Sequence, residues 1–201
     1  MNKIKLSNNK IIIDPMAVFF VTLITVIDKT GTVPVFLLSA LLHETGHIAA
    51  ILLCKGSINQ IKLEPFCLTL ERPQTDTSIL KDILISASGV FTNFILLLVS
   101  VCFYKKTGGS FFMFFSMTNG LIGVYNLLPL SFLDGGELIT QAEKLIFKEK
   151  ARGIIPKAFH ISTVILGIIT AVLLIVKKNY LYALLCFYPI LLNSANKKSK
   201  R

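Results

Sequence analysis

The 201-residue sequence has no tryptophan and little charge, since only 16% of its residues are Asp, Glu, Lys or Arg. A soluble domain carries about 25% charged residues, whereas 53% of this chain is hydrophobic and its mean hydropathy is +0.70. This composition excludes an ordinary soluble domain and favours a polytopic membrane protein. Acidic residues number 11 against 21 Lys and Arg. No basic helix or RNA-binding signature accompanies the positive charge, so we expect no nucleic-acid partner.

Cysteine is scarce, and its spacing lacks the C-x-x-C pairing of redox and zinc motifs. The four cysteines lie within or beside apolar segments, and we expect small buried hydrophobes in a reducing compartment: Cys54, Cys67, Cys102 and Cys186. No internal repeat or low-complexity segment divides the chain. The sequence therefore predicts one membrane-embedded domain, residues 1–201, with a core at 33–136 and accessory spans at 12–27 and 155–193.

Six apolar segments are candidate membrane spans: residues 12–27, 33–54, 83–103, 111–130, 155–176 and 180–193. A span needs about 20 residues, so the last one is short. A cytosolic N-terminus places 16 Lys and Arg residues on the cytosolic side and five on the other, which predicts that both termini are cytosolic. Asp14 and Pro15 interrupt the first segment, and no small-residue cleavage site follows it. We therefore expect a helix start and a span there rather than a signal peptide.

Residues 57–73 change to a period of two. Ile61, Leu63, Leu68 and Leu70 alternate with polar residues on either side of Pro65-Phe66, which predicts two short strands joined by a turn. This hairpin is either an amphipathic element on the membrane surface or a sheet edge that takes up an extended peptide as an added strand. The predicted fold class is an all-α polytopic membrane protein with about six transmembrane helices and this small β-hairpin between the second and third.

The second apolar segment contains three ionisable residues within five positions: His43, Glu44 and His47. On a helix, this spacing puts both imidazoles on one face, where they can hold the same metal ion. Ionisable groups inside a membrane span are costly and persist mainly where they are paired, liganded or next to water. A zinc ion there would lower the pKa of water, and Glu44 could take the proton. The motif predicts a metallohydrolase on the cytosolic side of the midplane; the alternative is a chance match or a pair of core histidines.

Asp134 is the best-placed carboxylate for a third zinc ligand, because a catalytic zinc usually has three protein ligands. Pro129 stops or bends the fourth span, and Gly135-Gly136 permits a tight turn that can point Asp134 back into the bundle. The alternative is that Asp134 caps a helix starting near Gly135.

Two asparagines and a third histidine are further polar residues at apolar segments. Asn126 could donate a hydrogen bond to a substrate carbonyl or a developing oxyanion, or merely cap the bend at the end of the fourth span. Asn93 most simply bonds to a neighbouring helix. His160 has no partner at metal-ligand spacing and is expected to be structural.

Three motifs together resemble the site-2 protease family of intramembrane zinc metalloproteases: they are His43-Glu44-Thr45-Gly46-His47, Ser88-Gly89-x-x-x-Asn93 and Asn126-x-x-Pro129-x-x-x-Leu133-Asp134-Gly135-Gly136. The resemblance covers most of the chain. The six-span plan and the order of the motifs are similar to the sporulation branch, that of stage IV sporulation protein FB.

The resemblance implies one zinc ion and cleavage of a membrane-tethered protein near the cytosolic face, often a sigma or transcription factor precursor. It also implies roles by position: His43, His47 and Asp134 as zinc ligands, Glu44 as general base, and Asn126 and Asn93 lining the substrate site. Two departures follow from the same comparison. Val90 replaces a proline of the family motif, so the role of Asn93 can differ from that in the family. The nucleotide-sensing domain that sporulation members carry after the last span is not expected here, so control and substrate can differ as well, and a membrane protein is a candidate regulatory partner.

Two other functions fit parts of the pattern. Zinc proteases of other families share the short motif but use a glutamate as third ligand in a soluble domain, which this composition does not support. A non-catalytic metal-binding membrane protein could use the histidines to hold a partner. The presence of Glu44 favours an enzyme, because metal binding alone would not need a base beside the histidines.

Overall fold

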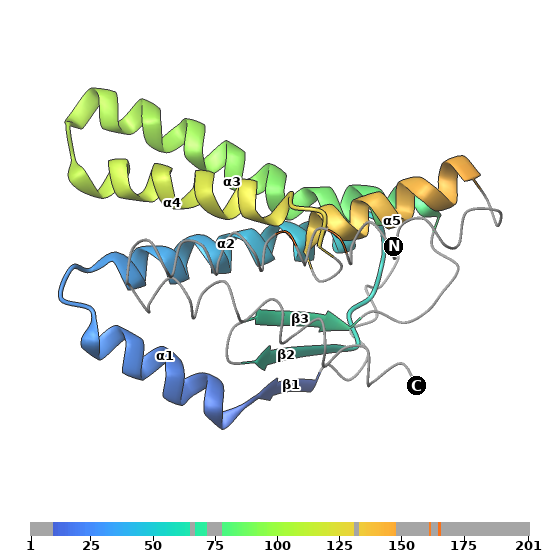
Figure 1. Ribbon diagram of the computed structural model, residues 1–201, viewed down its shortest axis with the longest axis horizontal. Coiled ribbons are helices and arrows are strands. Elements are labelled where there is room, and N and C mark those ends of the chain that lie inside the picture. The colour runs from blue at the N-terminus through green and yellow to red at the C-terminus, as the bar shows by residue number, and fades with distance from the viewer. Residues whose placement is uncertain are drawn as a thin grey trace, which may run out of the picture. The chain divides into compact units, whose positions relative to one another are not determined.

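The computed structural model describes residues 10–64, 67–71, 78–130 and 133–147, together with 161 and 165. The chain forms two compact units, residues 1–125 and 126–201. In chain order the elements are β1 (Lys10–Ile13), α1 (Pro15–Ile27), α2 (Thr32–Leu53), β2 (Gln60–Glu64), β3 (Cys67–Glu71), α3 (Ile79–Thr107), α4 (Ser110–Asn126) and α5 (Asp134–Phe147) (Figure 1). The predicted spans 155–176 and 180–193, with His160 and Cys186, lie outside the described residues except for Ile161 and Ile165, which are helical.

Helices α2 and α3 are long and apolar enough to cross a membrane. Their 22 and 29 residues correspond to lengths of about 33 Å and 43 Å, against a hydrocarbon core of about 30 Å. They match the predicted spans 33–54 and 83–103, and α3 extends beyond both predicted ends. The two helices support a membrane protein, while the six-span plan and the cytosolic termini stay predictions.

The prediction for the first span is wrong at its start. Residues 10–13 form β1, and α1 has only 13 residues, which corresponds to a length of about 20 Å. Asp14 caps α1 by accepting a hydrogen bond from the backbone N–H of Met16 at 2.9 Å. Pro15 occupies the first turn, where its missing N–H has no cost. The helix start predicted at this Asp-Pro pair is thus confirmed, but a helical span from residue 12 is not.

The two predicted strands of the hairpin are confirmed, and they are part of a larger sheet, while the predicted turn at Pro65-Phe66 lies outside the described residues. Strands β2 and β3 are antiparallel, with Ile61 opposite Leu70 and Leu63 opposite Leu68. Strand β1 adds to β2 in parallel, with Ile11 opposite Ile61, so the strand order is β1-β2-β3. An all-α class therefore has to be corrected to a mostly helical fold with a three-stranded mixed sheet. The outer strands of this sheet are β1 and β3.

Helices α2 and α3 pack closely against each other over the middle of α2. A Cβ atom added to Gly46 would lie 2.9 Å from the Ser88 carbonyl oxygen and would also overlap the Thr92 side chain. Small residues at such contacts allow helix backbones to approach, as expected in membranes. Helix α3 then continues into α4 through a turn at Gly108, whose φ of +66° suits glycine (Figure 1). Because of this turn, α4 runs antiparallel to α3.

One segment end and one cysteine differ from the sequence-based expectation. Helix α4 ends at Asn126 rather than at residue 130, because the chain turns ahead of Pro129. Cys54 and Cys102 are free thiols, but Cys102 is exposed, so the expectation of burial within the protein is wrong for it. Cys102 lies on α3, which is apolar enough to cross a membrane, so its thiol can face lipid.

The loop between α1 and α2 is held by the carboxylate of Asp28. Its oxygens accept hydrogen bonds from the hydroxyl and N–H of Thr30 and, at 2.8 Å, from the N–H of Val33 in the first turn of α2. The hydrogen bond from the Thr30 side chain, followed by that from the Val33 backbone, lowers the pKa of Asp28 below its ordinary value. The ionised form is therefore the one that stabilises this loop.

Replacing Asp28 by Ala should lower the melting temperature of the detergent-solubilised protein at neutral pH. Because the folded-state pKa lies below the unfolded one, this stabilisation is present above about pH 4 and is lost as the pH falls through the folded-state value. The difference in melting temperature between wild type and variant should therefore shrink below about pH 4. Lys29→Ala, which changes the adjacent side chain, is the control. A difference that stays constant between pH 7 and pH 3 would contradict this assignment.

Candidate metal centre

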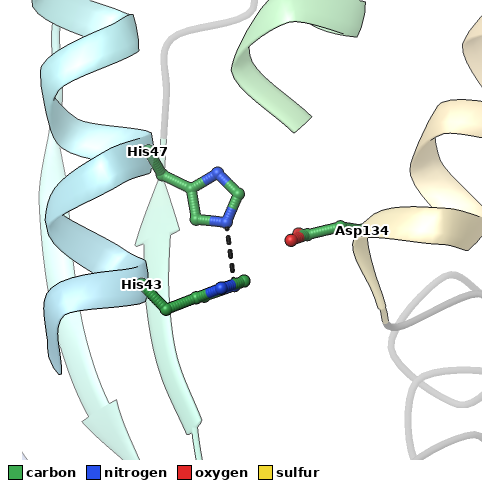
Figure 2. Close-up of side chains that lie close together, drawn as sticks. All are labelled: His43, His47 and Asp134. Carbon is green, nitrogen blue, oxygen red and sulfur yellow. Dashed lines mark hydrogen bonds between the residues drawn. The ribbon is translucent and has the colours of Figure 1, made fainter. Parts of the chain in front are cut away.

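The two histidines of α2 lie on its buried face. Ser39, His43, His47 and Ile51 follow one another at intervals of four residues, and all are buried. His43 is 5% exposed and His47 is 9% exposed. The Nε2 atoms of the two imidazoles are 3.2 Å apart, and the ring planes cross at 81° (Figure 2). The helical spacing predicted from the sequence thus brings the two ring nitrogens together.

Each imidazole is oriented from α3 through its Nδ1 atom. Nδ1 of His43 lies 3.0 Å from Oδ1 of Asn93, and Nδ1 of His47 lies 2.8 Å from the carbonyl oxygen of Ile85. Both partners are oxygen acceptors, so both Nδ1 atoms carry hydrogen. The hydroxyl of Ser88 donates to the same Ile85 carbonyl at 2.6 Å, which fixes that acceptor. With hydrogen on both Nδ1 atoms, both Nε2 atoms carry lone pairs, and these two atoms lie 3.2 Å apart.

This arrangement fits a metal ion. Two acceptor nitrogens 3.2 Å apart repel each other unless a proton or a metal cation lies between them. Nitrogen ligands about 2.0–2.1 Å from a tetrahedral zinc ion lie about 3.3 Å from one another, close to the observed separation. Nδ1–H groups bonded to oxygen acceptors are also the usual second contacts of zinc-bound histidines. The donor set and its spacing therefore suit zinc without rearrangement of either ring.

Gly89 provides the space that the imidazoles occupy. A Cβ atom at this position would lie 2.7 Å from Cε1 of His43 and would overlap Nε2 of His47. The glycine predicted as part of the Ser88-Gly89 motif is thus required for the close approach of α3 to the ring pair. Any larger residue would displace the nitrogens that face the metal site.

Gly89→Ala should lower zinc affinity by about tenfold or more, the scale of losses seen when the surroundings of metal ligands are disturbed. The rings can rotate away from the new methyl group, so the fold should persist. Gly123→Ala is a matched control on α4, because its Cβ would lie at an ordinary 3.4 Å from Cβ of Asn93. Chelator competition in detergent measures both affinities. Equal affinities in the two variants would show that the ring positions do not depend on Gly89.

Glu44 and Asp134 provide the carboxylates of the motifs. Glu44 lies one position beyond His43 on α2 and is half-buried. Asp134 is half-buried in the first turn of α5, where a negative charge is favoured by the helix dipole. A Cβ atom on the next residue, Gly135, would overlap the carbonyl oxygen of Leu127, so this glycine allows α5 to start against the bend that follows α4. Helix α5 thus starts at Asp134, one residue before the predicted start near Gly135, and Asp134 is its first residue rather than its cap.

Among the described residues, one group of three side chains could hold a metal ion, and it consists of His43, His47 and Asp134 (Figure 2). Each residue can offer one ligand atom, an imidazole nitrogen or a carboxylate oxygen. Two imidazoles and one carboxylate are a common protein ligand set of catalytic zinc, which leaves a fourth position for water or substrate.

The two asparagines of the motifs are found in different settings. Asn126 is the last residue of α4, and its predicted role toward substrate stays a prediction. Asn93 is completely buried and hydrogen-bonded to His43. This contact favours a role in orienting the imidazole over direct contact with substrate. The sequence-based expectation that Asn93 bonds to a neighbouring helix is confirmed.

Two buried residues near this site were missed by the sequence analysis. Asn119 on α4 and Ser39 on α2 are both completely buried, and Nδ2 of Asn119 donates to Oγ of Ser39 at 3.1 Å. Ser39 could have been found from the spacing of four that it shares with His43 and His47. Asn119 belongs to no motif, and a single polar residue in an apolar segment gives no further signal.

Comparison with known proteins supports the same kind of fold. No family model and no curated protein matches the sequence. In three dimensions the chain is similar to the site-2 protease from Methanocaldococcus jannaschii, with a TM-score of 0.63 and 17% sequence identity over 92% of this chain and 89% of that one. The chain therefore has a fold like that of a site-2 protease, as its motifs predicted.

Proposed function

We propose that this protein is an intramembrane zinc metalloprotease that cleaves a membrane-tethered protein near the cytosolic face. The observation that carries the proposal is the convergence of the His43 and His47 Nε2 atoms at 3.2 Å while both Nδ1 atoms face oxygen acceptors. A pair of core histidines would not need both metal-binding nitrogens turned toward each other. The site-2-protease-like fold supports a protease rather than another use of the metal.

The proposed zinc ligands are His43, His47 and Asp134, the group that could hold one ion. Zinc, when bound, lowers the pKa of water and polarises a carbonyl group. Buried surroundings strengthen such electrostatic effects, because the effective dielectric constant is lower than in bulk water. The half-buried setting of Glu44 suits a group that must exchange protons with water.

The proposed proton transfers belong to Glu44. Its carboxylate takes a proton from the attacking water and then returns it to the amine that leaves when the peptide bond breaks. Asn126 donates a hydrogen bond from its side-chain amide to the oxygen of the carbonyl under attack. Asn93 keeps its amide on His43 and takes no part in the proton transfer.

The substrate must present an extended backbone, since the hydrogen bonds of a helix shield its carbonyl groups. Strands β1 and β3 are the outer strands of the sheet and offer backbone groups to an added strand. We propose a membrane-tethered protein as substrate, with a sigma or transcription factor precursor as the expected class. The motifs in the sequence support this substrate class, the sporulation branch and a membrane regulatory partner. The charge distribution in the sequence supports cytosolic termini and the lack of a nucleic-acid partner.

Metal removal tests the proposal. The purified protein in detergent should carry about one zinc ion per chain and cleave a membrane-tethered substrate, and a chelator should abolish both. Zinc should restore cleavage, whereas magnesium should not, because magnesium prefers an octahedral set of oxygen ligands. Zinc binding without cleavage of any co-expressed membrane-tethered precursor would favour the non-catalytic metal-binding alternative. Cleavage that persists without metal would contradict the proposal.

A further inference from the structure

A buried amide on α4 has no part in the chemistry proposed above. Asn119 is 0% exposed although it lies in an apolar helix. Its Nδ2 group donates to the carbonyl oxygen of Phe115 at 2.8 Å and to Oγ of Ser39 at 3.1 Å. Its Oδ1 atom is buried and has no hydrogen-bond partner among the described residues. A buried acceptor left in this state lowers stability, so the residue needs an explanation other than stabilisation.

The backbone of Asn119 decides how the amide of Asn93 is turned. Nδ2 of Asn93 lies 3.4 Å from the carbonyl oxygen of Asn119. A carbonyl oxygen can only accept, so the NH₂ group of Asn93 must face α4 and its Oδ1 must face His43. With the amide turned the other way, the NH₂ group would face Nδ1 of His43, and that nitrogen would have to carry the lone pair.

The hydrogen on His43 Nδ1 therefore depends on where α4 holds one carbonyl group. In the present orientation, Nδ1 donates to Asn93 and Nε2 keeps the lone pair that a metal needs. The reversed orientation of Asn93 would favour hydrogen on Nε2 and block metal binding there. Because the bond from Asn93 to Asn119 is long, at 3.4 Å, a small shift of α4 would weaken it.

The side chain of Asn119 fixes the position of its own backbone carbonyl group on α4. Its bond to Ser39 ties α4 to α2 one helical turn before His43, on the same buried face. The four residues Ser39, Asn119, Asn93 and His43 thus form one hydrogen-bonded series across α2, α4 and α3. Asn119, on α4, is hydrogen-bonded both to Ser39 on α2 and to Asn93 on α3.

We propose that Asn119 is a positioning residue for the metal centre, which acts through Asn93 to keep His43 in the tautomer that presents Nε2. This inference rests on the proposed zinc site. It assigns a specific function to a residue outside the three motifs. Ser39 supports the same function by holding the Asn119 side chain.

Asn119→Leu keeps the branching at Cγ and removes the amide. Zinc affinity, measured by chelator competition in detergent, should fall about tenfold, and the visible absorption spectrum of the cobalt-substituted protein should change. Ser39→Ala should cause a smaller loss in the same direction. Ser116→Ala is the matched control, because Ser116 is also buried on α4 and its hydroxyl bonds to Met113 of its own helix. The melting temperature of Asn119→Leu should stay close to that of wild type, since an apolar residue replaces a poorly satisfied amide.

A double-mutant cycle separates positioning from general packing. If Asn119 acts through Asn93, then Asn119→Leu should cause almost no further loss of zinc affinity when Asn93 is already Leu. Additive losses from the two substitutions would overturn the inference, and so would an unchanged affinity in Asn119→Leu. Should Asn119→Leu fail to fold, the same cycle with Ser39→Ala decides the question. A wild-type protein that binds no zinc would instead refute the proposed function itself.

Discussion

Replacing Glu44 by Gln is expected to slow peptide-bond cleavage by about 10²–10⁴-fold, the usual contribution of a general acid–base group. By the usual relation between rate and barrier, this corresponds to about 3–5 kcal/mol in activation free energy. Glutamine has nearly the same shape, so the packing around position 44 should be kept. It has no carboxylate, however, and cannot take a proton from water. The rate of appearance of the cleaved product from a co-expressed or co-reconstituted precursor measures the effect.

Zinc content distinguishes loss of the base from loss of the site. Glu44→Gln should bind zinc as wild type does, because neither the imidazoles nor the bonds of their Nδ1 atoms to α3 are changed. Asp28→Asn, which neutralises a carboxylate in the loop between α1 and α2, should retain full cleavage and serves as the control. Processing at the wild-type rate by Glu44→Gln would remove Glu44 from the mechanism and count against the whole assignment.

Replacing His47 by Ala is expected to remove zinc and activity together. One of the three proposed protein ligands would be lost, and the Ile85 carbonyl would lose its imidazole partner. We expect zinc affinity to fall by more than about 100-fold, since changes outside the ligands alone cost about 10–100-fold. Metal analysis of the purified protein and the cleavage assay should therefore fail in parallel.

The third histidine provides the control for this experiment. His160→Ala should keep both zinc and activity, because His160 has no partner at metal-ligand spacing in the sequence. Full zinc occupancy in His47→Ala would place the metal elsewhere in the chain. Loss of zinc in His160→Ala, with wild-type binding in His47→Ala, would require a different set of ligands.

Much of the site could be predicted because its local pattern is periodic. The spacing of four on a helix placed His43 and His47 on one face before their distance was known. The period of two on either side of Pro65-Phe66 likewise predicted the two strands of the hairpin, in which Ile61 lies opposite Leu70. Both inferences use a repeat within a single element. The packing of the folded chain preserves these local arrangements.

The features that were missed depend on partners far away in the sequence. Strand β1 is a short apolar run without alternation, and it resembles the start of the following helix until β2 pairs with it. The orientation of His43 depends on Asn93, 50 residues away, and Asn93 in turn depends on Asn119. None of these follows from hydrophobic periodicity alone.

X-ray absorption at the zinc edge of the purified wild-type protein tests the central claim most directly. The proposal predicts a shell of nitrogen and oxygen ligands at about 2.0–2.2 Å, with the outer scattering of two imidazoles and no sulfur. The imidazole signal should disappear in His47→Ala. A sulfur shell at about 2.3 Å, which would come from the cysteines, or a spectrum without imidazole would contradict a zinc ion held by His43 and His47.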